Sequence, residues 1–231
     1  MRTNSINIEM LQIVAKGLGK LKNEVVFVGG AVAELYISDP GASEIRPTTD
    51  VDCVIELSTR LEYTALEKKL REKKFLNDMS EEAPICRWLF KDIKVDVMPT
   101  SEKILGFSNR WYSEGIEYKE VKILPDNTKV FVFSVEYFLA SKFEAYKGRG
   151  GNDLRQSTDF EDIIYIFDNS PDIVQSIENS KPEVKSYLKE ACRNLFENDN
   201  LNEGVECALP YGSGDNRVEI IIKRIQSVTK N

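Results

Sequence analysis

The spacing of apolar residues changes along the chain, and each spacing predicts a different element. Between residues 8 and 21 apolar side chains recur every three or four positions, which indicates an amphipathic helix. The run Val25–Val28 is continuously apolar, and residues 50–56 alternate apolar with polar side chains, both patterns typical of strands. From residue 134 onwards the helical spacing returns and continues through predicted helices at 172–179, 182–196 and 218–228, interrupted by loops at 198–204 and 209–215.

The middle of the chain predicts the rest of a sheet. Residues 60–74 have helical spacing and lead to two short strands, 86–90 and 93–97, separated only by Lys91 and Asp92, which suits an antiparallel hairpin. A short helix at 102–107 and two strands at 118–124 and 129–133 follow. We therefore expect an α/β (α+β) fold: a mixed sheet flanked by helices in residues 1–133, then a helical C-terminal lobe in residues 134–231.

Composition excludes several classes of protein. The net charge of −7 over 231 residues argues against a protein that coats nucleic acid non-specifically, although a local basic groove remains compatible with it. No apolar run approaches the roughly 20 residues needed to cross a bilayer, and residues 1–5 lack the apolar segment of a signal peptide, so we expect a cytoplasmic protein. The chain contains no histidine, which excludes a Ser-His-Asp triad and any histidine-ligated metal.

Two aspartates lie on one face of the strand predicted at residues 50–56. Successive side chains of a strand point to opposite faces, so Asp50 and Asp52 project together, whereas Val51 and Cys53 project to the other face. Two neighbouring carboxylates repel each other unless a cation neutralises them, and oxygen ligands of this kind suit Mg²⁺. The alternative interpretation is an ordinary strand end with two solvated aspartates.

Two further segments favour the metal interpretation. An apolar strand runs into Gly29 and Gly30, whose small size allows backbone amides to approach a phosphate closely. A later alternating strand carries Asp96, which becomes a third carboxylate if that strand pairs beside the first acidic strand. A glycine turn, a same-face acid pair and a further strand acid are the parts that a two-metal phosphoryl or nucleotidyl transfer site requires.

The order Val28-Gly29-Gly30, Thr49-Asp50-Val51-Asp52 and Val95-Asp96 resembles the polymerase-β-type nucleotidyltransferase superfamily. The resemblance implies a nucleotidyltransferase-type sheet and an enzyme that moves an NMP from an NTP to an acceptor hydroxyl, with Mg²⁺ or Mn²⁺ held by Asp50, Asp52 and Asp96. Asp96 is alternatively a polar strand residue without a ligand role. The serine that often follows the glycines in this superfamily is replaced by Ala31.

A lysine within the first helix after residue 134 is the next candidate. Lys142 lies among Phe138, Leu139 and Phe143, so its ammonium either snorkels to solvent or points at a triphosphate. A basic, glycine-rich loop at 147–152 contains Arg149 and precedes a helix in which Asp159 and Asp162 are one turn apart.

These helices resemble those of the abortive-infection (AbiEii/AbiGii-like) nucleotidyltransferase toxins, through residues 140–146, Arg149 and the run 158–163. The resemblance implies that Lys142 holds the NTP triphosphate, that Asp159 supports the site, and that Gly29, Gly30 and Arg149 contribute to nucleotide binding. It also implies an RNA 3′ end, such as that of tRNA, as the acceptor, and a cognate antitoxin as a partner. A small-molecule (antibiotic) nucleotidyltransferase and a non-catalytic binding module on the same scaffold are the alternatives.

Overall fold

The computed structural model describes residues 5–38, 41–149, 153–213 and 215–230. The chain divides into two compact units, one formed by residues 1–32 and 46–134 and the other by residues 33–45 and 135–231. The predicted functional boundary between residues 133 and 134 stays a prediction. The expectation for residues 1–4 lies outside the described residues, as do Gly150, Gly151 and Asn152 of the predicted basic loop.

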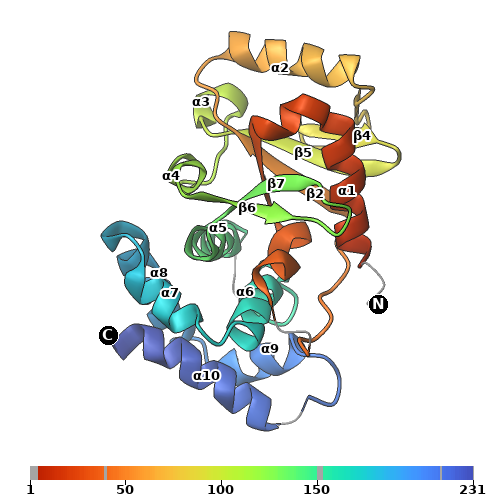
Figure 1. Ribbon diagram of the computed structural model, residues 1–231. Helices are drawn as coiled ribbons and strands as arrows, with labels where there is room; N and C mark the ends of the chain where they lie inside the picture. Colours follow the sequence, from red (N-terminus) through yellow and green to blue (C-terminus); the bar gives the residue numbers. More distant parts are fainter. Residues whose placement is uncertain (1–4, 39–40, 150–152, 214, 231) are drawn as a thin grey trace. The chain divides into compact units, whose positions relative to one another are not determined.

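The first unit is built on a sheet that has seven strands within the described part of the chain, in the order β3-β4-β5-β2-β1-β7-β6 (Figure 1). The pairs β2–β5 and β1–β7 are parallel and the remaining pairs are antiparallel, so the sheet is mixed, as predicted. The strands are β1 (Val25–Val28), β2 (Asp50–Ile55), β3 (Leu76–Asn77), β4 (Arg87–Phe90), β5 (Ile93–Pro99), β6 (Lys119–Ile123) and β7 (Lys129–Phe133).

The helices of the first unit bury the apolar stripes that the sequence predicted. In α1 (Ile6–Leu18) the side chains of Leu11, Val14 and Leu18 are fully buried, and the chain continues through the 3-10 turn η1 (Gly19–Asn23) to β1. The helix α2 (Arg60–Glu72) confirms the helix predicted at residues 60–74, and it lies in the connection between the parallel strands β2 and β5. Two shorter helices, α3 (Glu102–Leu105) and α4 (Tyr112–Glu117), also belong to this unit, whereas the 3-10 helix η2 (Gly30–Tyr36) contains residues of both units.

The second unit is helical, which confirms the predicted fold class. Its helices are α5 (Val135–Gly148), α6 (Thr158–Asn169), α7 (Ile173–Asn179), α8 (Pro182–Leu195), α9 (Leu201–Cys207) and α10 (Asp215–Lys230). The helix α5 packs on α6 and α8, and α10 packs on the four helices before it (Figure 1). None of the helices within the described residues is both long enough and apolar enough to span a membrane.

The loop predicted at residues 198–204 is wrong, because α9 begins at Leu201. Leu201 and Val205, one helical turn apart, are both buried, and this burial stabilises a turn that asparagines and a glycine disfavour in isolation. Gly204 is needed inside the helix because a Cβ at that position would overlap the side chain of Leu154. Tertiary packing therefore overrides the local preference of this segment.

Candidate functional site

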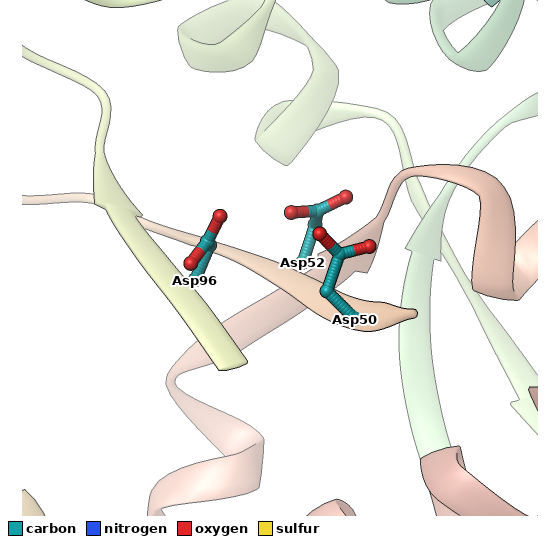
Figure 2. Close-up of side chains that lie close together, drawn as sticks. All are labelled: Asp50, Asp52 and Asp96. Carbon is teal, nitrogen blue, oxygen red and sulfur yellow. The ribbon is translucent and has the colours of Figure 1, made fainter. Parts of the chain in front are cut away.

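The pairing of β2 with β5 brings three carboxylates together. The parallel register places Asp52 directly beside Asp96, and Asp50 lies two residues before Asp52 on the same face of β2. Each of the three residues offers one carboxylate oxygen, and these oxygens lie within 4.8 Å of one another. Figure 2 shows the three carboxyl groups gathered above two neighbouring strands. The acid cluster Asp50, Asp52 and Asp96 thus joins residues more than 40 positions apart in the sequence.

The strand that carries two of these acids is anchored from its opposite face. Val51 and Cys53 alternate with the aspartates and are fully buried, so a shift of β2 by one residue would exchange apolar and acidic side chains. Asp50 and Asp52 are half-buried, and Asp96 is buried. Burial, with the nearby charges of Asp52 and Asp96, raises the pKa of the Cys53 thiol well above its ordinary value, so this cysteine stays neutral.

Gly29 makes room for the acid cluster. The residue has a φ of 73°, in the left-handed region that glycine tolerates best. A Cβ built at this position would overlap the carboxyl group of Asp52. Gly29 is therefore required both by its backbone conformation and by the position of Asp52. The predicted role of Gly29 and Gly30 in phosphate binding stays a prediction.

A guanidinium group lies beside the acid cluster. Arg87 is the direct cross-strand partner of Asp96 in the β4–β5 hairpin. Its Nε donates a hydrogen bond to Asp96 Oδ1 at 2.8 Å, its Nη2 donates to Asp96 Oδ2 at 2.8 Å, and the same Nη2 lies 3.3 Å from Asp50 Oδ2. The hydrogen bonds with Asp96, and then the nearby negative charges, raise the pKa of Arg87 further above its already high ordinary value.

The acid cluster fits a hard divalent cation. Its donors are carboxylate oxygens, which Mg²⁺ and Mn²⁺ prefer, and no histidine or thiolate ligand is among them. Oxygen ligands at about 2.1 Å from Mg²⁺ are separated by up to about 4.2 Å across the ion. The three carboxylate oxygens lie within 4.8 Å of one another, so small side-chain rotations would bring them to ligand distance from one ion. The three carboxylates and the Arg87 guanidinium together carry a formal charge of −2.

A second charge cluster lies within the second unit. The Lys142 ammonium pairs with Asp159 Oδ1 at 3.1 Å and with Asp162 Oδ2 at 2.6 Å, and all three residues are buried. Arg149 Nη1 lies 2.7 Å from Asp159 Oδ2, although 72% of its side chain is exposed. The four charges of this charge cluster, Lys142, Arg149, Asp159 and Asp162, cancel formally. From the sequence, the Lys142 ammonium was expected either to snorkel to solvent or to point at a triphosphate. The structure instead shows it paired with two aspartates of the next helix.

A depression opens beside this charge cluster. Its volume is about 260 Å³, and it lies where the chain passes from α5 to α6. Tyr146, Arg149, Ser157 and Asp159 are among the residues that line it. The remaining lining residues are Asp153, Gln156 and Thr158.

Within the described residues the predicted site residues therefore form two groups. Gly29, Asp50, Asp52 and Asp96 belong to one, and Lys142, Arg149 and Asp159 to the other. Sequence reasoning missed Arg87, although the two-residue turn of the predicted hairpin, counted outwards, pairs it with Asp96. It also left Asp162 without a role, although its spacing from Asp159 places both acids on one helix face.

No protein-family model matches the chain, and no curated protein matches it. Among solved structures, JHP933 from Helicobacter pylori is similar, with 11% sequence identity and a TM-score of 0.47 over 98% of this chain and 93% of that one. A second similar structure is a "putative nucleotidyltransferase from H. pylori", with 12% identity and a TM-score of 0.46 over 97% and 93% of the two chains.

Proposed function

We propose that this chain is a metal-dependent nucleotidyltransferase that moves an NMP from an NTP to an acceptor hydroxyl. The observation that supports this most directly is the acid cluster, in which three carboxylate oxygens from two adjacent strands lie within 4.8 Å. When bound, Mg²⁺ or Mn²⁺ supplies stabilisation of the charge that develops on the α-phosphate as a hydroxyl attacks and pyrophosphate leaves. Asp50, Asp52 and Asp96 would hold the cation.

The residues of the first unit divide the work of preparing this site. Buried Val51 and Cys53 hold β2 in the register that keeps Asp50 and Asp52 on one face. Gly29 leaves space for the Asp52 carboxylate, and its missing side chain also leaves the backbone open to a phosphate group. Gly30 begins η2, and we propose that it shares this contact.

For the acceptor we propose an RNA 3′ end, such as that of tRNA, with a cognate antitoxin as the protein that controls the enzyme. The support is the resemblance of residues 140–146 and 158–163 to the abortive-infection toxins. We also propose that Lys142 and Arg149 contribute positive charge to the triphosphate and that Asp159 supports Lys142. Arg149 is the more available of the two cations because most of its side chain is exposed, whereas Lys142 is buried between two acids.

The test is transfer of label from each α-³²P-NTP to purified tRNA, with Mg²⁺, with Mn²⁺ and with a chelator. We expect metal-dependent labelling by the wild-type protein and a loss of at least about 10³-fold in Asp50→Asn and Asp52→Asn, because each change removes one charged ligand. Glu56→Gln, a change at an exposed position just beyond the same strand, is the matched control and should retain full activity.

Two other outcomes would replace parts of the proposal. Labelling of aminoglycosides without labelling of RNA would assign a small-molecule acceptor. Full cellular effect of both aspartate variants would instead indicate a non-catalytic module.

For the triphosphate role, Arg149→Met should raise the KM for NTP with little change in kcat, and an unchanged KM would remove Arg149 from the nucleotide site.

A further inference from the structure

Arg87 places a positive charge in contact with two members of the acid cluster, Asp50 and Asp96. It reaches this place because β4 and β5 pair directly, so that residue 87 lies opposite residue 96. Only 18% of the Arg87 side chain is exposed, so its charge is less screened by water than that of a surface arginine. The guanidinium therefore supplies part of the positive charge that a metal ion would supply to the carboxylates.

The contacts of Arg87 are unequal. Asp96 receives two parallel hydrogen bonds at 2.8 Å each, the fork arrangement that makes arginine–carboxylate pairs strong and directional. Asp50 receives one contact at 3.3 Å, from a nitrogen already bonded to Asp96. A change in the charge of the site will thus break the Asp50 contact before the Asp96 contacts.

Without a bound cation, the acid cluster would carry three mutually repelling carboxylates. Arg87 offsets part of this repulsion, since it pairs with two of the three acids. A divalent cation bound to the same oxygens repels the guanidinium and competes for the lone pairs of Asp50. Both effects make the affinity for the cation lower than it would be without Arg87.

We propose that Arg87 is a built-in counter-ion of the active site. It stabilises the metal-free fold, and its contact with Asp50 breaks when a divalent cation binds. Asp96 remains fixed by the two-hydrogen-bond contact throughout, so Arg87 acts as a positioning residue for the acid cluster. This inference rests on the proposed function in one respect, namely that the acid cluster binds a divalent cation.

The experiment compares the wild-type protein with Arg87→Met, which removes the charge, and Arg87→Lys, which keeps the charge but loses the fork. Mn²⁺ binding is measured by the EPR signal of the free ion, and thermal unfolding is followed by tryptophan fluorescence in chelator and in saturating Mn²⁺. Both tryptophans, Trp88 and Trp111, lie in the first unit, so fluorescence reports on the unit that holds the site. Arg60→Met, at an exposed arginine of the same unit, is the control.

We expect Arg87→Met to bind Mn²⁺ about tenfold more tightly than the wild type, because a competing charge has been removed. Its melting temperature should fall in chelator, and Mn²⁺ should raise it by more than it raises that of the wild type. Arg87→Lys should lie between the two, and Arg60→Met should match the wild type. If Arg87→Met does not fold in chelator, the counter-ion role is tested by Arg87→Lys, which should bind Mn²⁺ more tightly than the wild type.

Equal or weaker Mn²⁺ binding by both Arg87 variants would overturn the counter-ion role. If the wild-type protein still transfers label to an acceptor, equal or weaker Mn²⁺ binding by the variants leaves the proposed function intact. Conversely, tighter binding by Arg87→Met in a protein that transfers no nucleotide would support the counter-ion role while the proposed function fails. A wild-type protein that binds no Mn²⁺ would overturn both.

Discussion

Single residues in this protein have roles that depend on their neighbours in space. Gly29 is necessary because a side chain there would meet Asp52, and Lys142 holds two acids of the next helix. The family resemblance implies a nucleotide-binding role for each of these two residues, and the contacts in the structure give each of them a structural role as well. A loss of activity on substitution would therefore not separate the two roles, and measurements of stability and metal binding are needed.

Replacing Gly29 by alanine tests whether this residue makes room for Asp52. We expect Gly29→Ala to destabilise the first unit by about 1–2 kcal/mol, from its left-handed backbone, and to weaken Mn²⁺ binding by about 10–100-fold, because Asp52 must move. Gly106→Ala is the control: its φ is 87°, yet a Cβ there would meet no atom within 4 Å. Unfolding in urea, followed by tryptophan fluorescence, and Mn²⁺ titration give both quantities. Equal Mn²⁺ affinity in the two variants would contradict the steric role.

Removing the Lys142 charge tests the charge cluster of the second unit. Lys142→Met leaves Asp162 and Asp159 buried without their shared ammonium, which should cost about 3–5 kcal/mol of unfolding free energy. Adding Asp162→Asn should recover part of this loss, since one of the stranded charges is then gone. Lys223→Met, which breaks an exposed pair with Glu219, should cost less than about 1 kcal/mol. Urea unfolding followed by circular dichroism measures all three, and a cost for Lys142→Met as small as that for Lys223→Met would argue against the cluster.

At the scale of elements, local periodicity predicted most of the fold. The hairpin of β4 and β5 follows from two alternating runs around Lys91 and Asp92, whose φ values of 48° and 65° suit a two-residue turn with left-handed conformations. The same periodicity failed where elements are short. The helix α4 and the two-residue strand β3 were not predicted, because six and two residues are too few to show a repeating pattern, and β3 is defined by its pairing with β4.

The crossover helix α2 begins with a capping box that can be tested alone. Thr59 Oγ1 accepts a hydrogen bond from the Glu62 backbone N–H, and the Glu62 carboxylate accepts one from the Thr59 backbone N–H. Thr59→Ala should destabilise the first unit by about 1 kcal/mol, because a helix N–H loses its partner. Thr64→Ala, at an exposed position inside the same helix, should be neutral or slightly stabilising. Urea midpoints compare the two variants, and equal midpoints would show that the box contributes nothing.

At the scale of the whole molecule, the two clusters of charged side chains differ in formal charge. The four residues of the charge cluster in the second unit sum to zero, whereas the three acids of the acid cluster and Arg87 sum to −2. This difference is independent of any resemblance, and it favours the first unit as the place where a divalent cation binds.

The buried thiols make stability fall at alkaline pH. Burial raises the pKa of Cys192 to about 12, whereas an unfolded cysteine titrates near 8.5. The folded pKa is the higher one, so this contribution is complete below about pH 8.5 and is lost as pH rises towards 12. At pH 10 the loss should reach about 2 kcal/mol for this thiol.

Urea unfolding between pH 7.5 and about 10 tests this contribution. Cys192→Ala should show a smaller decline of stability with pH than the wild type, even though its stability is lower throughout. Cys207→Ser, at the exposed cysteine, should decline as steeply as the wild type. An unchanged decline in Cys192→Ala would show that this thiol does not contribute.

The sequence by itself determined most of the longer elements and which of their residues share a face, because alternation and helical spacing are local properties of the chain. It placed Asp50 and Asp52 on one face of a strand, and it put Asp159 and Asp162 one helical turn apart. Only the tertiary structure decided that β5 pairs with β2, that Gly29 abuts Asp52, and that the Lys142 ammonium lies between two acids. Those contacts join residues distant in sequence, and they depend on how buried surfaces pack, which no local pattern encodes.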